Sequence, residues 1–263
     1  MDRRSVFFLP WQGEFGIYIS TFVRAVHTWL AEDKIVACPA GECCLFPTAS
    51  SFYHDFEELV PDRKRVGRKE TPWVKDKLER LQERICQEHP QYRDYEFVMP
   101  FMKYDCFRSP QQIIKACFAP KIVSRGLEVD VVLTPRKRSF HTERNLAFWQ
   151  EILNGLKDRG LSIGAVGRKD TSFHLTGIDI NSWDYDGIDA CIEMMQNAKI
   201  ILAQNCGLAH LAIFLRTPMI MMRTGNGMIC WMEQQRDNAA FFKIVEPECR
   251  IAIQETLSYL ACK

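Results

Sequence analysis

In "AKIILAQNCGLAHLAIFLRTPMIMM", Ala198 to Met222, a short polar segment separates two apolar runs, and this pattern is the most informative one for the fold. The first run, "IILAQ", is short and continuously hydrophobic, which is typical of a strand in a parallel sheet buried on both faces. "LAHLAIFL" predicts a helix and "PMIMM" predicts a further strand. The segment "QNCG" is therefore the loop between a strand and the helix that follows it. In open α/β sheets, ligands bind at such loops, outside the carboxyl ends of the strands.

This loop and the start of its helix are candidates for binding an anionic ligand. Glycine lets the backbone come close to a ligand, and the N–H groups at a helix N-terminus attract negative charge. The histidine one turn into the helix is expected to face the same ligand. The alternative is a plain strand–turn–helix in which Asn205 and Gly207 only shape the turn, because short motifs have many false positives. The candidate residues are Gln204, Asn205, Cys206, Gly207 and His210.

On both sides of this stretch, predicted strands and helices alternate through the second half of the chain. A helix over 146–160 lies between two predicted strands, and it ends in the glycine expected past a helix C-terminus. Further helices are expected over 187–199 and 248–263. The strands are "EVDVVLTP", "LSIGAVG", "IILAQ" and "PMIMMR".

The first half shows a similar alternation. "SVFFLP" and "KIVACPA" predict strands on either side of a helix over 17–34, whose apolar residues, Leu30 among them, recur at helical spacing. A second helix is expected over 72–90, followed by a strand in "YEFVMPFM". A strand–helix–strand series is the unit of a parallel sheet. The sequence therefore predicts an α/β protein with two Rossmann-like domains facing across a cleft, residues 1–122 and residues 123–263.

Composition excludes several classes of protein. The chain has 263 residues, 47% of them apolar and 25% charged, as in an ordinary globular protein. A net charge of +1 argues against a general nucleic-acid binder, although a local basic patch stays open. No stretch reaches the roughly 18 uninterrupted apolar residues of a membrane span. The N-terminal apolar run is too short for a signal peptide. We therefore expect a cytoplasmic protein.

Metal binding is not expected from the spacing of the ligand-type residues. The eleven cysteines contain no CxxC pair and are interpreted as reduced thiols. The adjacent Cys43 and Cys44 are poorly suited to a shared structural zinc, and His54 lacks ligand spacing. The acidic pair in "DYD", residues 184–186, precedes a predicted helix, so N-terminal capping is preferred over a metal site.

The decisive stretch resembles the donor-binding segment of GT-B glycosyltransferases, in particular the ADP-heptose:lipopolysaccharide heptosyltransferase-like family 9. That family's pattern runs strand, Asp-Ser-Gly, two residues, His-Leu-Ala, then Gly-Thr-Pro and a further strand. The resemblance covers residues 128–223. This chain departs from it at residues 204–206, where Gln-Asn-Cys stands and the Asp is missing. The residues kept are Gly207, His210, Leu211, Ala212, Thr217 and Pro218.

The resemblance implies that a nucleotide-sugar donor binds the C-terminal half as a substrate, with no further cofactor. In the family, the loop after the first C-terminal strand carries a cation for the donor phosphates. Here that loop is basic, and the alternative is an ordinary solvated loop. Arg168, in the loop after the next strand, is expected near the base or ribose, with a polar turn as its alternative. The basic candidates of the first loop are Arg136, Lys137, Arg138 and Arg144.

The N-terminal half offers a candidate general base. The family places a Gly-Asp pair after its first strand, and that Asp serves as the catalytic base. Gly13 and Glu14 stand at this place. A carboxylate within hydrogen-bond reach can accept the proton of an attacking acceptor hydroxyl. The alternative is that Glu14 merely lies near the positive end of the following helix. One carboxylate without a second acid implies inversion at the anomeric carbon.

Three functional classes therefore stay open. The leading hypothesis is a metal-independent, inverting glycosyltransferase. One rival is a catalytically silent nucleotide- or glycan-binding protein on the same scaffold, and the other is a sugar-nucleotide epimerase or hydrolase. The expected acceptor is a glycan or another molecule with a hydroxyl group. The basic run "DRKRVGRKE", residues 62–70, is interpreted as a solvated face, with binding of an anionic acceptor, a phosphorylated glycan or a nucleic acid, as the alternative.

Overall fold

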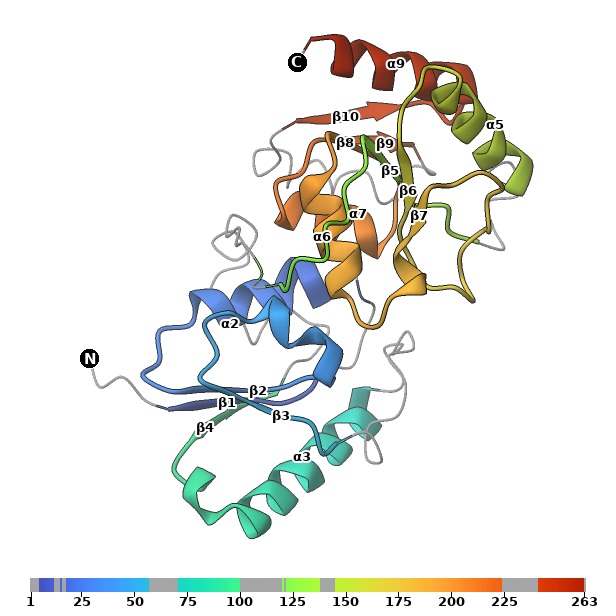
Figure 1. The fold of residues 1–263 in the computed structure, drawn as a ribbon. Helices are drawn as coiled ribbons and strands as arrows, with labels where there is room; N and C mark the ends of the chain where they lie inside the picture. Colours follow the sequence, from blue (N-terminus) through green and yellow to red (C-terminus); the bar gives the residue numbers. More distant parts are fainter. Residues whose placement is uncertain are drawn as a thin grey trace. The chain divides into compact units, whose positions relative to one another are not determined.

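A computed structural model describes residues 5–11, 15, 18–56, 71–99, 120, 122–137, 145–223 and 241–262. The chain divides into two compact units, Met1–Ala116 and Cys117–Lys263. Each unit holds one parallel sheet with helices packed against it (Figure 1). Within the described ranges, no helix is both long and apolar enough to cross a membrane.

The N-terminal unit is built on a four-stranded parallel sheet in the order β3-β2-β1-β4. Strand β1 (Val6–Phe8) lies between β2 (Lys34–Ala37) and β4 (Glu96–Val98), and β3 (Ser51–Tyr53) pairs with the outer side of β2. Both central strands are buried along their whole length, which accounts for their uninterrupted apolar sequence.

Helices cover the two faces of this sheet (Figure 1). On one face lie the π-helix η1 (Tyr18–Val23) and α2 (Arg24–Thr28), and on the other lies α3 (Thr71–Glu88). Successive strand residues point to opposite faces. Phe7 therefore joins the cluster that includes α3, whereas Phe8 contacts the rings of η1 and of the residue after α2. Two 3₁₀ helices complete the described elements, η2 (Ala40–Leu45) and η3 (Pro90–Tyr92).

The helix predicted over 17–34 is shorter than expected. It ends at Thr28, because Trp29 takes an extended conformation with φ −69° and ψ 124°. The indole of Trp29 then packs edge-on against Phe8 at 5.6 Å between ring centroids. Leu30, which the helical spacing had placed in the core, is 87% exposed. Tertiary packing of one tryptophan thus ends the helix earlier than its apolar periodicity suggests.

The C-terminal unit has a six-stranded parallel sheet in the order β10-β9-β8-β5-β6-β7. In chain order its strands read 3-2-1-4-5-6 across the sheet, the arrangement of a dinucleotide-binding Rossmann fold. The strand order reverses between β5 and β8. The strands are β5 (Val131–Leu133), β6 (Ile163–Ala165), β7 (Ile180–Asn181), β8 (Ile200–Gln204), β9 (Met219–Met222) and β10 (Phe242–Val245).

In the described part of this unit, helices cover both faces of the sheet (Figure 1). Helices α5 (Leu146–Lys157) and α9 (Cys249–Ala261) share one face, where their apolar residues join the core of β5, β8 and β9. Helices α6 (Asp189–Asn197) and α7 (Gly207–Phe214) cover the other face. Asn145 caps α5 by accepting a 3.1 Å hydrogen bond from the backbone N–H of Phe148.

The capping role expected for the "DYD" segment is wrong. Helix α6 begins at Asp189, its N-cap is Ile188, and no side chain provides a cap hydrogen bond. Asp184 instead ends the short 3₁₀ helix η5 (Ser182–Asp184), where its carboxylate accepts a 3.2 Å hydrogen bond from Asn181. The acidic pair therefore belongs to a turn that precedes the helix.

A buried glutamate holds the start of the second unit in place. Oε1 of Glu193, on α6, accepts hydrogen bonds from the backbone N–H groups of Arg125 at 2.7 Å and Gly126 at 2.9 Å, and from the Ser124 hydroxyl at 2.9 Å. Burial alone would raise the pKa of this carboxyl, but the hydrogen bonds outweigh burial and the net pKa lies below its usual value. Glu193 is therefore held as a carboxylate.

Candidate functional site

The strand order of the C-terminal unit selects one place for a ligand. At the reversal between β5 and β8, the helices that follow the two strands leave toward opposite faces, which opens a crevice outside the carboxyl ends. Helices α5 and α7 do lie on opposite faces (Figure 1). Leu133 pairs with Leu202, so the loops after β5 and β8 leave the sheet side by side. The decisive "QNCG" loop is one of these two.

Hydrogen bonds join these two loops directly. The side-chain amide of Gln204 donates to the backbone carbonyl oxygen of Arg136 at 2.7 Å. The backbone N–H of Gln204 donates to the Thr134 hydroxyl at 3.3 Å, and the Cys206 thiol lies 3.9 Å from the same hydroxyl. Because Gln204 and Thr134 are both fully buried, these hydrogen bonds join the two loops away from solvent.

The other end of the Gln204 amide is unsatisfied. Its Oε1 atom is buried and accepts no hydrogen bond within the described ranges. Leaving a buried acceptor without a donor costs about 1–3 kcal/mol, and buried polar groups in folded proteins nearly always find a partner. This oxygen is therefore suited to a donor from a bound molecule, such as a hydroxyl or an amino group.

The N-terminus of α7 adds an attraction for negative charge. Its N-cap, Cys206, has an extended backbone and makes no side-chain cap hydrogen bond. The backbone N–H of Ala209 donates to the Cys206 carbonyl oxygen at 3.0 Å, but the first turn receives no side-chain acceptor from Cys206. Together with the helix dipole, the N–H groups of this turn favour a phosphate or another anion. Gly207, the first helical residue, is buried and has no side chain to obstruct the approach.

The loop after β6 packs against both of the others. Gly167 has φ +151°, a conformation that favours glycine, and a β-carbon there would meet the Ser172 hydroxyl at 2.3 Å. That added β-carbon would also lie 3.9 Å from the Leu208 side chain, in the first turn of α7. The backbone N–H of Lys137 donates to the Thr171 carbonyl oxygen at 2.8 Å. Three strand ends thus converge on one site.

The predicted donor-binding residues have different environments. Arg136 is half-buried and its main chain forms a bridge with Ser172, whereas Lys137 is exposed. Asn205 and His210 are buried. Arg168 is 78% exposed, and its guanidinium pairs with Asp170 at 3.0 Å. Gly13, Glu14, Arg138 and Arg144 lie outside the described residues, so their roles stay predictions.

Sequence reasoning did not single out Thr134, Ser172 or Ser182. Thr134 directly follows the predicted strand "VVL", and this position at a strand end was a usable signal. Ser172 and Ser182 carried no such signal. They support the site by contact with Gly167, whose backbone N–H donates to the Ser182 hydroxyl at 3.2 Å.

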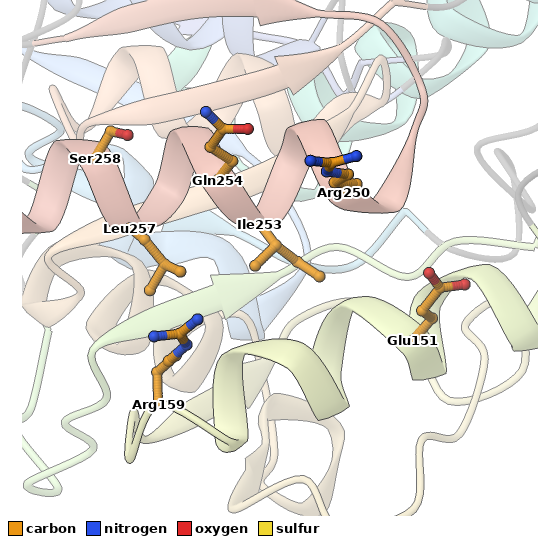
Figure 2. Close-up of a pocket in the computed structure, with 7 residues that line it drawn as sticks. All are labelled: Glu151, Arg159, Arg250, Ile253, Gln254, Leu257 and Ser258. Carbon is orange, nitrogen blue, oxygen red and sulfur yellow. The ribbon is translucent and has the colours of Figure 1, made fainter.

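A second hollow lies elsewhere on this unit, in the groove between α5 and α9 (Figure 2). It has a volume of about 560 Å³, and Ile253 and Leu257 point from α9 toward α5. Charged residues surround these two. No residue of the loops after β5, β6 or β8 lines the groove, so it is separate from the candidate site. The lining residues are Glu151, Arg159, Arg250, Ile253, Gln254, Leu257 and Ser258.

Known structures share this fold along the whole chain. The E. coli ADP-heptose LPS heptosyltransferase II superposes with a TM-score of 0.58 over 98% of this chain and 99% of its own, at 13% identity. The fold is that of the heptosyltransferases. A glycosyltransferase of family 9 from Veillonella parvula matches with a TM-score of 0.57, at 8% identity and with coverage of 100% and 99%. The heptosyltransferase fold expected from the "QNCGLAH" stretch is thereby confirmed.

The heptosyltransferase fold is also close to that of other sugar-nucleotide proteins. A proposed UDP-N-acetylglucosamine 2-epimerase from Listeria monocytogenes matches with a TM-score of 0.50 and 10% identity, over 98% of this chain and 88% of its own. No protein-family model and no curated protein sequence matches the chain. At these identities the likeness establishes the fold, and function has to be argued from the site.

Proposed function

We propose that this protein is a glycosyltransferase that moves a sugar from a nucleoside-diphosphate donor to an acceptor hydroxyl. The observation that carries the proposal is the convergence at the β5–β8 reversal. A helix N-terminus without a side-chain cap, a buried amide oxygen without a described partner and a basic loop meet there. The solved structures of similar fold include heptosyltransferases, one of them with ADP, which supports this class of donor.

The donor phosphates would bind at the start of α7. A diphosphate needs charge compensation, and here the helix N-terminus and the basic residues Arg136 and Lys137 supply it. The same groups would stabilise the diphosphate leaving group as its negative charge develops. Because these groups can carry the compensation, we propose a metal-independent transfer. Gln204 Oε1 would accept a hydrogen bond from the nucleoside.

Glu14 would be the general base, with Gly13 allowing close approach of the backbone to the donor. It would take the proton of the acceptor hydroxyl as that oxygen attacks the anomeric carbon. The bond from the anomeric carbon to the diphosphate breaks, and its electron pair leaves with the phosphate. A single displacement of this kind inverts the configuration at the anomeric carbon.

The second candidate is a sugar-nucleotide epimerase or hydrolase. Its support is the structural likeness to the proposed 2-epimerase. Both candidates need a nucleotide sugar at the same crevice, so nucleotide binding alone does not separate them. Product formed without an acceptor favours the second candidate. Binding without turnover favours a silent nucleotide-binding protein.

The experiment starts with calorimetric titration of nucleoside diphosphates, followed by turnover assays with the corresponding nucleotide sugars. The double variant Arg136→Ala, Lys137→Ala tests the basic loop. A charge-assisted hydrogen bond contributes about 1.5–3 kcal/mol, so the loss of one contact should weaken binding about tenfold or more. The matched control is Arg159→Ala, Arg250→Ala, which removes the same charge at the α5–α9 groove.

The proposal requires nucleotide affinity to fall in the loop variant and to stay unchanged in the control. Equal losses in both variants would indicate only a nonspecific effect of net charge. If no nucleoside diphosphate binds the unmodified protein at millimolar concentration, the proposal is wrong.

A further inference from the structure

Three side chains at the carboxyl edge of the N-terminal sheet bring two thiols and an imidazole together. Cys38 directly follows β2, His54 directly follows β3, and Cys43 lies in η2 between these strands. One ligand atom from each lies within 4.8 Å of the other two. Throughout the part of the chain that the structure describes, this is the one group of three or more such side chains with the spacing of a metal site.

The hydrogen bond of the histidine determines which of its ring nitrogens can bind a metal. Nδ1 of His54 lies 2.6 Å from the backbone carbonyl oxygen of Cys38. A carbonyl only accepts, so Nδ1 carries the proton and Nε2 keeps its lone pair. Nε2 lies 3.8 Å from the Sγ atom of Cys43. Metal-binding histidines are commonly oriented in this way, with the second ring nitrogen donating to a backbone carbonyl.

The size of the triangle fits a tetrahedral ion. Zinc binds thiolate at about 2.3 Å and imidazole at about 2.0–2.1 Å, which places neighbouring ligand atoms about 3.5–3.8 Å apart. The Cys43 Sγ to His54 Nε2 distance of 3.8 Å agrees with this range, and the three ligand atoms all lie within 4.8 Å of one another. Thiolate and imidazole ligands suit zinc better than calcium or magnesium, which prefer oxygen.

The backbone around the three residues is already ordered. The N–H of Cys38 donates to the Tyr53 carbonyl oxygen at 3.2 Å, so the ends of β2 and β3 are joined next to the cluster. Beside Cys43, the Glu42 carboxylate accepts a 2.7 Å hydrogen bond from the Tyr18 hydroxyl, which holds η2 against η1. Three ligands on adjoining, hydrogen-bonded segments need little reorganisation to close around an ion.

We propose that Cys38, Cys43 and His54 bind one zinc ion at the carboxyl edge of the N-terminal sheet. The two thiols lose their protons to solvent as the zinc–sulfur bonds form, and no atom changes oxidation state. Three protein ligands leave the fourth tetrahedral position to water or to an exogenous ligand. His54 is exposed, so this position is accessible from solvent. The site lies in the N-terminal unit and does not depend on the donor-site proposal.

The sequence carries only half of a zinc motif here: Cys38 and Cys43 have a spacing found in zinc sites, but no second close ligand pair follows them. Cys38 and Cys43 are separated by four residues, and Cys43 and His54 by ten. The sequence drew attention to the adjacent pair Cys43 and Cys44. In the structure Cys43 joins the cluster, and Cys44 is not part of it.

The test measures zinc bound to the full chain purified under reducing conditions. Metal content by mass spectrometry gives the stoichiometry, and titration with Co²⁺ reports thiolate ligands by their charge-transfer absorption. The unmodified protein should hold one equivalent. Cys43→Ser and His54→Gln should lower zinc affinity by more than about 100-fold, because even an outer partner contributes 10- to 100-fold. Both positions are at least partly exposed, so the variants should fold.

Two cysteines serve as controls. Cys86→Ser removes a half-buried thiol of α3 in the same unit, and Cys44→Ser removes the neighbour of the proposed ligand. Both should retain the zinc and the cobalt spectrum. Circular dichroism checks that each variant is folded. Zinc binding should also raise the thermal midpoint of the unmodified protein and leave that of Cys43→Ser unchanged, since only the folded state holds the ligands together.

Several outcomes would overturn the proposal. One is the absence of both bound zinc and a thiolate-to-cobalt band in the unmodified protein. Another is unchanged binding in Cys43→Ser and His54→Gln. A third is a disulfide between Cys38 and Cys43 found by peptide mapping of protein purified under reducing conditions, because the cluster would then be a redox pair.

Discussion

The side-chain amide of Gln204 and the backbone carbonyl oxygen of Arg136 are joined by a 2.7 Å hydrogen bond across 68 residues of sequence. This bond links the loops after β5 and β8 at the point where the strand order of the sheet reverses. The bond orients the Gln204 amide. Its nitrogen is used in the contact between the loops, and its oxygen is left to accept a hydrogen bond from a ligand.

Gln204→Leu should reduce both stability and nucleotide affinity. The substitution removes the bond to Arg136 and leaves a carbonyl oxygen unpaired, which costs about 1–3 kcal/mol in the free energy of unfolding. Urea denaturation measures that loss, and calorimetry measures nucleoside-diphosphate affinity. Thr256→Val is the matched control, because it removes a buried hydroxyl bond on α9, 2.8 Å to Ala252, with no part in the loops. Unchanged affinity in Gln204→Leu, or an equal loss in the control, would contradict the ligand role.

Glu14→Gln should lower turnover and leave donor affinity almost unchanged. The amide keeps nearly the same shape but cannot accept the acceptor proton. A positioned general base contributes about 10²–10⁴ in rate, so kcat should fall by that order. The assay compares kcat with the dissociation constant of the donor for the same variant. Normal turnover would place the base elsewhere.

Asp130→Asn should lower stability at neutral pH and not at strongly acidic pH. The ammonium of Lys199 at 2.6 Å, with hydrogen bonds from the Ser162 backbone N–H and hydroxyl, lowers the pKa of Asp130 from 3.8 to about 2. A carboxyl group whose pKa is lower in the folded than in the unfolded state stabilises the fold at pH values above its unfolded-state pKa. This stabilisation is lost as the pH falls through the folded-state pKa.

For Asp130 this window runs from about pH 4 down to about pH 2. A shift of one unit corresponds to about 1.4 kcal/mol, and partial exposure of the pair to solvent reduces the total to about 1–2 kcal/mol. Denaturation of both proteins from pH 2 to pH 7 should show a difference that grows through this window. A difference that does not vary with pH would show that the charge of Asp130 is not its cause.

Arg216→Gly should stabilise the protein by about 0.5–1 kcal/mol. Glycine adopts the left-handed backbone conformation without a steric cost, and only part of this gain is offset by the larger conformational entropy that glycine loses on folding. Arg216 follows α7 with φ +57° and is exposed. The N–H of Thr217 donates to the Ala212 carbonyl oxygen, and that of Arg216 donates to Ile213, which together form a Schellman motif. Arg216→Ala keeps a β-carbon and should give no gain. Equal stability of the two variants would show that backbone strain at this position is negligible.

The central strands of both sheets, and the helices between them, could be predicted from local sequence patterns. Strands such as β5 and β8 are buried along their full length, so their apolar runs stand out in the sequence. The strands that these patterns missed, β3, β7 and β10, all lie at sheet edges. An edge strand keeps one side toward solvent, and each of these three has at most one buried residue, so no continuous apolar run marks them.

For the candidate site, the sequence identified which loops matter, because a polar loop after a buried strand is a local pattern. Which atoms meet in these loops depends on the tertiary fold. The contact of Gln204 with Arg136 depends on β5 and β8 being neighbours, which no local pattern specifies. The same holds for Cys38, Cys43 and His54, because the pairing of β2 with β3 is what places His54 beside the two cysteines. Hydrophobic periodicity predicts secondary structure from a few neighbouring residues. The order of strands in a sheet is set by the packing of the whole unit, and the contacts named above depend on that order.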